Sequence, residues 1–219
     1  MIERRVLSKD EQQIRDGLQQ LSEMVQTAID NACKALADLD TSLCNTIITG
    51  DEKINAQHNE IEQLCLTTIA TQQPVATDLR VLVAAMHISV ELERMADYAS
   101  GIAKTIIKMA NEKPVEGIDK VMLMANACKD ILQQAIQAYL AYDSEQAMTV
   151  AGKDQEIDNM QTKISDGIIQ QMCQNNSLVP FGSCLLWIVH NLERIGDRAT
   201  NICEQIVYVK MGETPDLNR

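Results

Sequence analysis

The sequence is poor in the residues that build sheets and irregular folds. Only 3% of its 219 residues are aromatic, only four are proline, and no run of alternating β-branched residues occurs. Ala, Leu, Ile, Met, Gln and Glu are abundant instead, and most of these residue types favour helices. The composition therefore predicts an all-α protein.

Paired cysteines and long hydrophobic runs are also missing. The seven cysteines are an odd number with no C-x-x-C pair, which argues against a disulfide or zinc framework. The N-terminal residues 1–5 lack the apolar core of a signal peptide, and no apolar run reaches the length of a membrane span. We expect a soluble, cytoplasmic protein with reduced thiols and no direct membrane insertion.

Positive charge is scarce, with 19 Lys and Arg against 31 Asp and Glu and a net charge of −12. Nucleic-acid phosphates would be repelled by such a chain, so protein partners or cations suit it better. Nucleotide-binding loops and the serine-hydrolase elbow are absent from the sequence. The Glu-x-x-His motif of di-iron enzymes is missing too, because Asn55, Ala84 and Trp187 stand three residues before the histidines. The sequence therefore gives no support for nucleotide hydrolysis, acyl transfer or ferritin-like di-iron chemistry.

The chain contains an internal duplication. The motif L-E-R-x-x-D occurs at residues 92–97 and again at residues 192–197, a separation of 192 − 92 = 100 residues. Upstream of each copy lies a related segment, Asp51–Asn55 before the first and Asp154–Asp158 before the second. Two copies of one unit of about a hundred residues explain this pattern.

Apolar residues at three-and-four spacing predict six long amphipathic helices. Their expected approximate bounds are 10–39, 42–71, 77–111, 118–142, 144–174 and 180–211. Asp40 and its neighbours provide capping side chains for the second helix, and Gly50 is expected to interrupt or bend it. Thr77 is the expected N-cap of the third.

The segment Asn111–Gly117 contains both Pro and Gly and predicts a linker between two domains. Short connections make neighbouring helices antiparallel, so each repeat becomes an up-down-up bundle. The predicted fold is all-α, with two tandem, pseudo-symmetric three-helix bundles. We place the first repeat at residues 1–112, the second at 118–211, and a frayed C-terminal tail at 212–219.

The last predicted helix carries two parallel rows of side chains. Its apolar row predicts the buried face and consists of Leu185, Val189, Leu192, Ile195, Ala199, Ile202 and Ile206. The polar row beside it consists of His190, Glu193, Asp197, Asn201 and Glu204. Like charges stacked in this way repel one another unless a positive group neutralises them.

Carboxylates at i and i+4 present two oxygen ligands on one helix face, as hard and borderline cations require. Glu193 and Asp197 form such a pair, and Asp158 and Asn55 add ligands if the middle helices turn them towards the third helices. The alternative is a solvated helix surface that the neighbouring arginines 94, 194 and 198 partly neutralise. A lone histidine such as His190 is more often a structural residue than a ligand.

Four stretches together resemble the PhoU family over essentially the whole chain. They are residues 50–55, 73–80, 91–97 and 193–204, with E-R-I-G-D-R-x-x-N-I-C-E as the most specific. The resemblance implies a cytoplasmic signalling protein and not an enzyme, which acts as a negative regulator of phosphate uptake and phosphate-starvation signalling. Such an adaptor links the ATPase subunit of the phosphate ABC transporter to a sensor histidine kinase, and the family fold is often homodimeric.

The resemblance also implies a multinuclear metal cluster, with iron or another divalent metal, on the carboxylate rows. The candidate ligands are Glu193, Asp197, Asn201, Glu93, Asp97, Asp158 and Asn55. Repeat one departs from the pattern, because Gly101 and Lys104 stand where repeat two has Asn201 and Glu204. The alternative function is an iron-binding helical protein with a storage, sensing or redox role.

Overall fold

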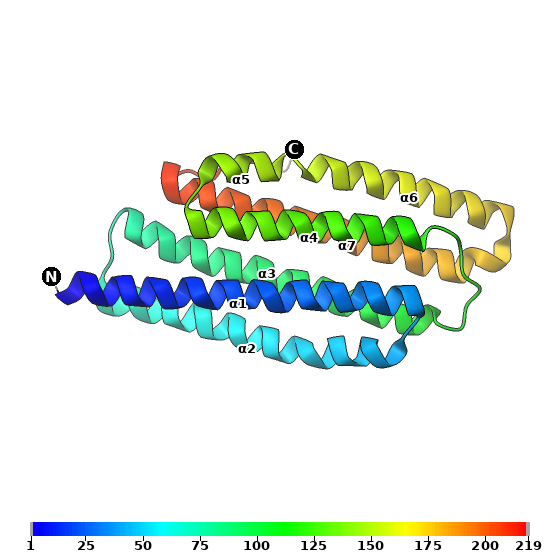
Figure 1. The fold of residues 1–219 in the computed structure, drawn as a ribbon, viewed down its shortest axis with the longest axis horizontal. Helices are drawn as coiled ribbons and strands as arrows, with labels where there is room; N and C mark the ends of the chain where they lie inside the picture. The colour runs from blue at the N-terminus through cyan, green and yellow to red at the C-terminus, as the bar shows by residue number, and fades with distance from the viewer. Residues whose placement is uncertain (1, 218–219) are drawn as a thin grey trace.

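The computed structural model describes residues 2–217, with side chains from residue 7 onwards. These residues form seven α-helices and a single turn of 3-10 helix, and no strand. The elements are α1 Ile2–Asp38, α2 Thr41–Gln72, α3 Thr77–Met109, α4 Ile118–Ala141, α5 Ser144–Ala151, α6 Asp154–Gln174, η1 Asn176–Leu178 and α7 Val179–Met211. Figure 1 shows them as one elongated bundle of nearly parallel rods.

The second helix of each repeat begins with the same kind of cap. The Asp40 carboxylate accepts from the backbone N–H groups of Ser42 and Leu43 at 2.9 and 3.0 Å, which confirms the predicted start of the second helix. In the same way, the Asp143 carboxylate accepts from the backbone N–H groups of Glu145 and Gln146 in the first turn of α5 at 3.0 and 2.9 Å. Each aspartate satisfies two donors that a helix N-terminus leaves unpaired.

The two middle helices differ from the prediction. α2 runs without interruption through Gly50, so a break there is wrong, and the bend that was the alternative stays a prediction. The predicted helix 144–174 is instead divided, because the chain turns at Gly152 and Lys153 between α5 and α6. In the third helix Ala76, not Thr77, holds the N-cap position, and it makes no side-chain cap.

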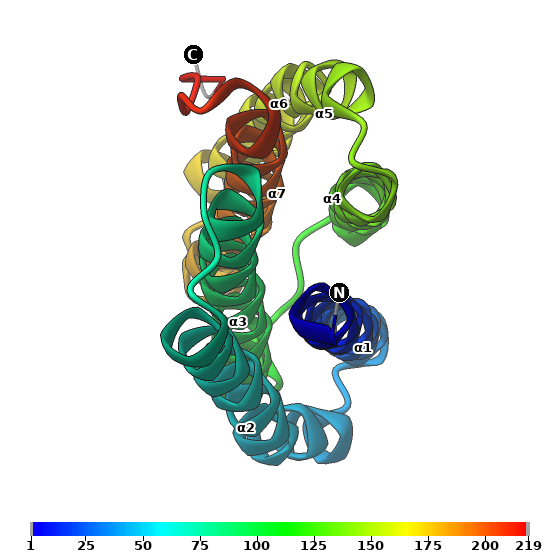
Figure 2. The same cartoon turned by 90° about the vertical axis from the view of Figure 1, so that its left-hand side faces the viewer.

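The two repeats pack side by side on one continuous core. α3 contacts α7 along its length and α1 contacts α4, so the third helices form the main seam between the repeats. Figure 2, which looks along the helices, shows α1 and α4 on one side, α3 and α7 on the other, and α2 and α5–α6 at opposite extremes. The predicted apolar row of α7 is buried throughout. The predicted architecture of two tandem helical repeats is confirmed.

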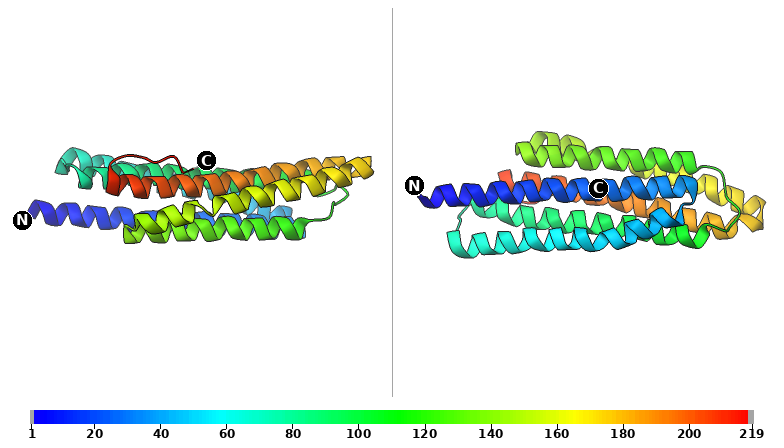
Figure 3. Two further views of the ribbon diagram at one scale, coloured as in Figure 1. Left: turned by 90° about the horizontal axis from the view of Figure 1, so that it is seen from above. Right: turned by 60° about the horizontal axis from the view of Figure 1, so that its bottom comes forward.

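Neither the linker nor the described part of the tail is loose. Glu116 donates its N–H to the Gln171 side chain at 2.8 Å and accepts from it at 3.0 Å, which fixes the linker to α6. After α7, Gly212 adopts a left-handed conformation with φ 79°, and the chain folds back along the helix (Figure 3). The predicted fraying is wrong for residues 212–217, while residues 218 and 219 lie outside the described chain. No helix among the described residues is long and apolar enough to cross a membrane.

Candidate functional site

Four carboxylates of repeat two surround one hollow between α6 and α7. Asp154 and Asp158 come from the first turns of α6, and Glu193 and Asp197 come from α7. The hollow has a volume of about 350 Å³. Three of the predicted ligands, Asp158, Glu193 and Asp197, therefore line a common space together with Asp154, and we call this space the repeat-two acidic pocket.

The charges in this pocket are poorly solvated. Asp154 is 9% exposed, and its burial, together with the charges of Asp197, Asp158 and Glu193, raises its pKa to about 7. Burial also raises the pKa of Glu193, and Asp197 raises it further. The pKa of Asp197 is raised by burial although two arginines beside it act in the opposite direction. A cation would relieve this repulsion.

Protein cations neutralise only part of the acidic pocket. The Arg194 guanidinium donates to the Asp197 carboxylate at 2.6 Å. His190 Nδ1 lies 3.4 Å from Glu193 Oε2, and this histidine is more than half exposed. The arginine thus has the neutralising role considered for it in the sequence, while the histidine stands at the rim.

Gly196 allows α6 and α7 to approach closely beside the acidic pocket. A Cβ atom at this position would lie 2.8 Å from Ile157 Cδ1 and 3.0 Å from Asp154 Oδ1. Both distances are shorter than van der Waals contact, so only glycine fits without rearrangement. The corresponding residue of repeat one is Ala96, which is buried.

Two oxygens of the repeat-two acidic pocket are buried and make no hydrogen bond in the described chain: Asp154 Oδ1 and Glu193 Oε2. Buried carboxylate oxygens normally have a donor or a cation, so the donor set fits a hard or borderline cation. Among residues 2–217, however, no group of three His, Cys, Asp or Glu side chains converges in the arrangement of a ready-made metal site. The pocket therefore contains oxygen donors of the kind that cations bind, but these donors do not converge on one point in the structure.

The C-terminal tail forms one wall of the acidic pocket. Leu217 lines it together with Gly152 and Asp154, and the Leu217 N–H donates to Glu204 Oε1 at 2.8 Å. Glu204 thus binds the tail and is not among the residues that line the pocket. Sequence analysis missed this contact because nothing in residues 212–217 indicates where the segment folds.

Asn201 also lies outside the residues that line the acidic pocket. Its Nδ2 donates to Glu91 Oε2 at 3.1 Å, and Arg198 donates to the same oxygen at 3.1 Å. Arg94 lies 3.6 Å from the other Glu91 oxygen. Glu91 of α3 therefore gathers partners from both repeats across the central seam.

Repeat one has a related cluster between α2 and α3. The charges of Asp51 and Asp97 both raise the pKa of Glu93, and burial contributes most to that rise. Asn55 donates to Asp51 Oδ2 at 3.4 Å, while its own Oδ1 is buried without a hydrogen bond in the described chain. Burial and the charge of Asp97 raise the pKa of Asp51, and the positive charge of Lys104 opposes this rise, so the cluster contains the cation that the sequence comparison of the repeats indicated.

Asp154 and Asp51 were not among the predicted site residues. Each precedes a predicted ligand by four positions, Asp158 and Asn55 respectively, and so lies on the same face of its helix. The duplicated segments that begin with these aspartates contained the necessary signal. Their membership of the two clusters is seen only when α2 is packed against α3 and α6 against α7.

Comparison with known proteins decides the family. The PhoU domain profile matches twice, at residues 18–106 and 121–206. The chain belongs to the PhoU family. The two matches lie on either side of the linker at residues 111–117.

Relatives match this PhoU-family chain from end to end. The phosphate-specific transport system accessory protein PhoU homolog of Clostridium acetobutylicum is 31% identical over 216 residues, which cover 98% of this chain and 99% of the relative. The protein of the same description from Streptococcus pneumoniae serotype 4 is 32% identical over 198 residues, with 90% and 92% covered.

Solved PhoU structures share the fold. The phosphate transport system regulatory protein PhoU from Streptococcus pneumoniae superposes with a TM-score of 0.90 at 30% identity, covering 96% of this chain and 99% of that one. PhoU from Pseudomonas aeruginosa gives a TM-score of 0.88 at 27% identity, with 94% and 99% covered. The chain is thus a two-repeat PhoU protein, and its relatives support a regulatory role in phosphate transport.

Proposed function

We propose that the protein is a cytoplasmic adaptor and negative regulator of phosphate uptake and phosphate-starvation signalling. It would link the ATPase subunit of a phosphate ABC transporter to a sensor histidine kinase, through protein contacts and without catalysis. The observation that carries this proposal is the end-to-end match to relatives named as accessory proteins of phosphate transport. That match favours regulation over an iron-storage or redox role.

The mechanism we propose is steric and allosteric. Long helical faces such as those of α1, α2 and α6 offer surfaces for large partners, and the two repeats provide two related sets of them. An adaptor of this kind inhibits when the partner complex favours one conformation of the kinase or transporter. We also propose a homodimer, and light scattering at several protein concentrations tests this oligomeric state.

The test of the adaptor role is a clean deletion in the host. Phosphate-responsive genes should remain switched on at high phosphate in the deletion strain, and the intact gene should restore repression. Purified protein should bind the ATPase subunit or the cytoplasmic part of the kinase in a pull-down. Normal repression in the deletion strain, or failure of the folded protein to bind either partner, contradicts the proposal.

We further propose that the repeat-two acidic pocket binds a divalent cation, iron in particular, as an accessory to this role. Asp154, Asp158, Glu193 and Asp197 would hold it. The observation in favour is that two buried carboxylate oxygens make no hydrogen bond with the described residues, although His190 Nδ1 lies 3.4 Å from one of them. A bound cation would supply positive charge where four carboxylates meet, and so would stabilise the packing of α6 on α7.

Titration of metal-free protein tests the cation proposal. Added ferrous or manganous ion should raise the melting temperature of the native protein and bind in calorimetry. The effect should disappear in Asp154→Asn/Glu193→Gln and persist in Asp166→Asn, which changes an exposed carboxylate of the same helix. Equal melting temperatures with and without metal in the native protein would count against the site.

A further inference from the structure

A long groove separates α1 from α2 on the outside of repeat one. Two adjoining hollows of about 830 and about 350 Å³ make it up, and Gln20 lines both. On α1 the lining runs from Gln13 to Asn31, and on α2 from Thr46 to Thr67. At 1.5 Å per residue the α1 side is about 27 Å long, which is the length of about five helical turns.

Two glycines keep this α1–α2 groove open. Gly50 of α2 lines it, and a Cβ atom there would meet nothing within 4 Å. Gly17 of α1 lines the other hollow, where a Cβ atom would lie 3.2 Å from Ile61 Cγ1. A larger side chain at Gly50 would extend into space that the structure leaves empty, and one at Gly17 would press against Ile61 in the groove.

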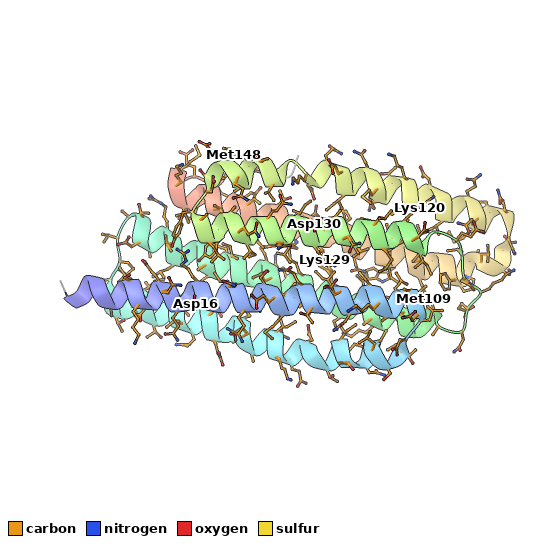
Figure 4. The ribbon with its side chains drawn as sticks, viewed as in Figure 1. Asp16, Met109, Lys120, Lys129, Asp130 and Met148 are labelled. Carbon is orange, nitrogen blue, oxygen red and sulfur yellow. The ribbon has the colours of Figure 1, made fainter. Side chains whose placement is uncertain are left out.

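In repeat two, a side chain bridges the place that corresponds to Gly50. The two caps align the repeats with a shift of 143 − 40 = 103 residues, so that Lys153 corresponds to Gly50 and Gln134 to Asn31. Lys153 Nζ donates to Gln134 Oε1 at 2.7 Å and so bridges the space between the helices. Lys120, labelled on α4 in Figure 4, corresponds in the same way to Gly17. At the position of Gly50 the groove of repeat one is therefore open, whereas a side chain bridges the corresponding place in repeat two.

The chemistry of the α1–α2 groove is that of a surface for an amphipathic helix. Its floor is apolar and consists of Met24, Ala28, Ile47, Ile54, Ile61 and Leu64. Its rim carries amides and the charged residues Asp16, Glu23, Glu60 and Lys53.

The charged residues on the rim of the α1–α2 groove indicate which charge a partner segment should have. Asp16, labelled in Figure 4, accepts from Gln12 at 2.8 Å, and Glu23 accepts from Gln19 at 3.1 Å. These neutral donors leave the carboxylate charges in place, and none of Asp16, Glu23 and Glu60 belongs to an ion pair among the described residues. Three acids against one lysine leave the rim negative, which favours a basic segment.

We propose that the α1–α2 groove of repeat one docks a basic amphipathic helix, of about five turns, from a protein partner. The inference rests on the adaptor function proposed above and assigns one partner contact to repeat one alone. Apolar side chains of the partner helix would lie on the floor between α1 and α2, and its Lys or Arg residues would face the acidic rim. The groove and the acidic pockets would then serve different ligands.

Binding of groove variants to the two partners tests this inference. Gly50→Lys recreates the arrangement of repeat two and fills the groove. The matched control is Gly167→Lys, because Gly167 is also in the middle of a helix, a Cβ atom there would meet nothing within 4 Å, and the charge change is equal. Both substitutions raise helix propensity, so both variants should fold. Gly50→Lys should weaken binding to the ATPase subunit or the kinase at least about tenfold, and the control less than about twofold.

Hydrogen exchange on the unmodified protein gives a second readout that needs no variant. The bound partner should protect amides within residues 13–31 and 46–67, and Asp16→Asn/Glu60→Gln should reduce the association rate and its dependence on salt. Equal partner affinities of the native protein and Gly50→Lys, or protection confined to other helices, would contradict docking in the α1–α2 groove. The adaptor function would not be contradicted by either result, because the partner still binds. Failure of the native protein to bind either partner would overturn both proposals.

Discussion

Asp154 is the residue whose charge is most affected by the fold. It lies at the start of α6 and faces Glu193 and Asp197 of α7, with Asp158 one turn further along its own helix. Its pKa of about 7 exceeds the value of about 3.9 for an unfolded chain. Because folding raises this pKa, the charged form of Asp154 is disfavoured in the folded state. The contribution of Asp154 to the free energy of unfolding is therefore fully present below about pH 4 and is lost as the pH rises through about 7.

We therefore predict that Asp154→Asn stabilises the metal-free protein at pH 8 and has little effect at pH 4.5. The expected gain at pH 8 is about 2 kcal/mol, because the variant no longer buries a charge among three other carboxylates. Urea unfolding in chelator at both pH values measures it, with Asp166→Asn as the exposed control. A gain of the same size at both pH values would show that charge is not the cause.

Gly196 is the second residue on which the acidic pocket depends. We predict that Gly196→Ala destabilises the protein by about 1–3 kcal/mol, since the new Cβ would lie 2.8 Å from Ile157 Cδ1. Gly167→Ala, with open space around it, should instead stabilise by about 0.5–1 kcal/mol. Thermal unfolding compares the two, and Ile157→Val should recover part of the loss in the double variant. Additive effects of the two substitutions would contradict the steric explanation.

At the scale of elements, the capping aspartates start the middle helices of both repeats. Asp40 caps the 32-residue helix α2, whereas Asp143 caps α5, which has eight residues. We predict that Asp40→Ala and Asp143→Ala each cost about 1 kcal/mol, and that the Asn variants cost little because an amide oxygen also accepts. In Asp143→Ala, hydrogen exchange should accelerate throughout α5, while in Asp40→Ala it should accelerate only in the first turns of α2. Equal exchange in native and variant protein would contradict this.

The elements also show what periodicity in the sequence can predict. The buried faces of α3 and α7 follow three-and-four spacing, so their apolar residues were predictable, and the Asp40 cap was as well. The glycines were misleading. Gly50 lies in an unbroken helix and Gly152 lies at a break, although both are helix-internal glycines by local pattern. The difference depends on packing between helices, which one segment of sequence does not contain.

At the scale of the whole molecule, the two repeats share one core. The α3–α7 seam joins them along its length, and Glu91 of α3 pairs with Arg198 of α7 at 3.1 Å. We predict that the full chain unfolds in one transition and that residues 1–112 alone do not form a stable monomer, because separation exposes the buried seam. The single tryptophan, Trp187, reports on repeat two, while far-UV circular dichroism reports on both repeats. Separated transitions by these two probes would show independent domains.

The same scale limits what could be predicted of the site. The L-E-R-x-x-D motif predicted that Glu193 and Asp197 lie on one face of the last helix. The duplicated segment 154–158 placed Asp158 on the middle helix, and all three residues line the pocket. Asn201 and Glu204 share that row but lie further along α7, where Glu91 and the Leu217 N–H bind them. Helix spacing defines a row of side chains, but the contacts between elements decide which part of the row forms a pocket.

The folded-back tail has a practical consequence for how the protein is produced. A purification tag of histidines placed directly after residue 219 would begin three residues after Leu217, which lines the repeat-two acidic pocket. Tag imidazoles are good ligands for first-row metals and would compete with the pocket for the ion being measured. An expression vector that places the tag before α1 keeps it at the other terminus (Figure 1) and leaves the pocket wall intact. Metal content measured on C-terminally tagged protein would report the tag as well as the fold.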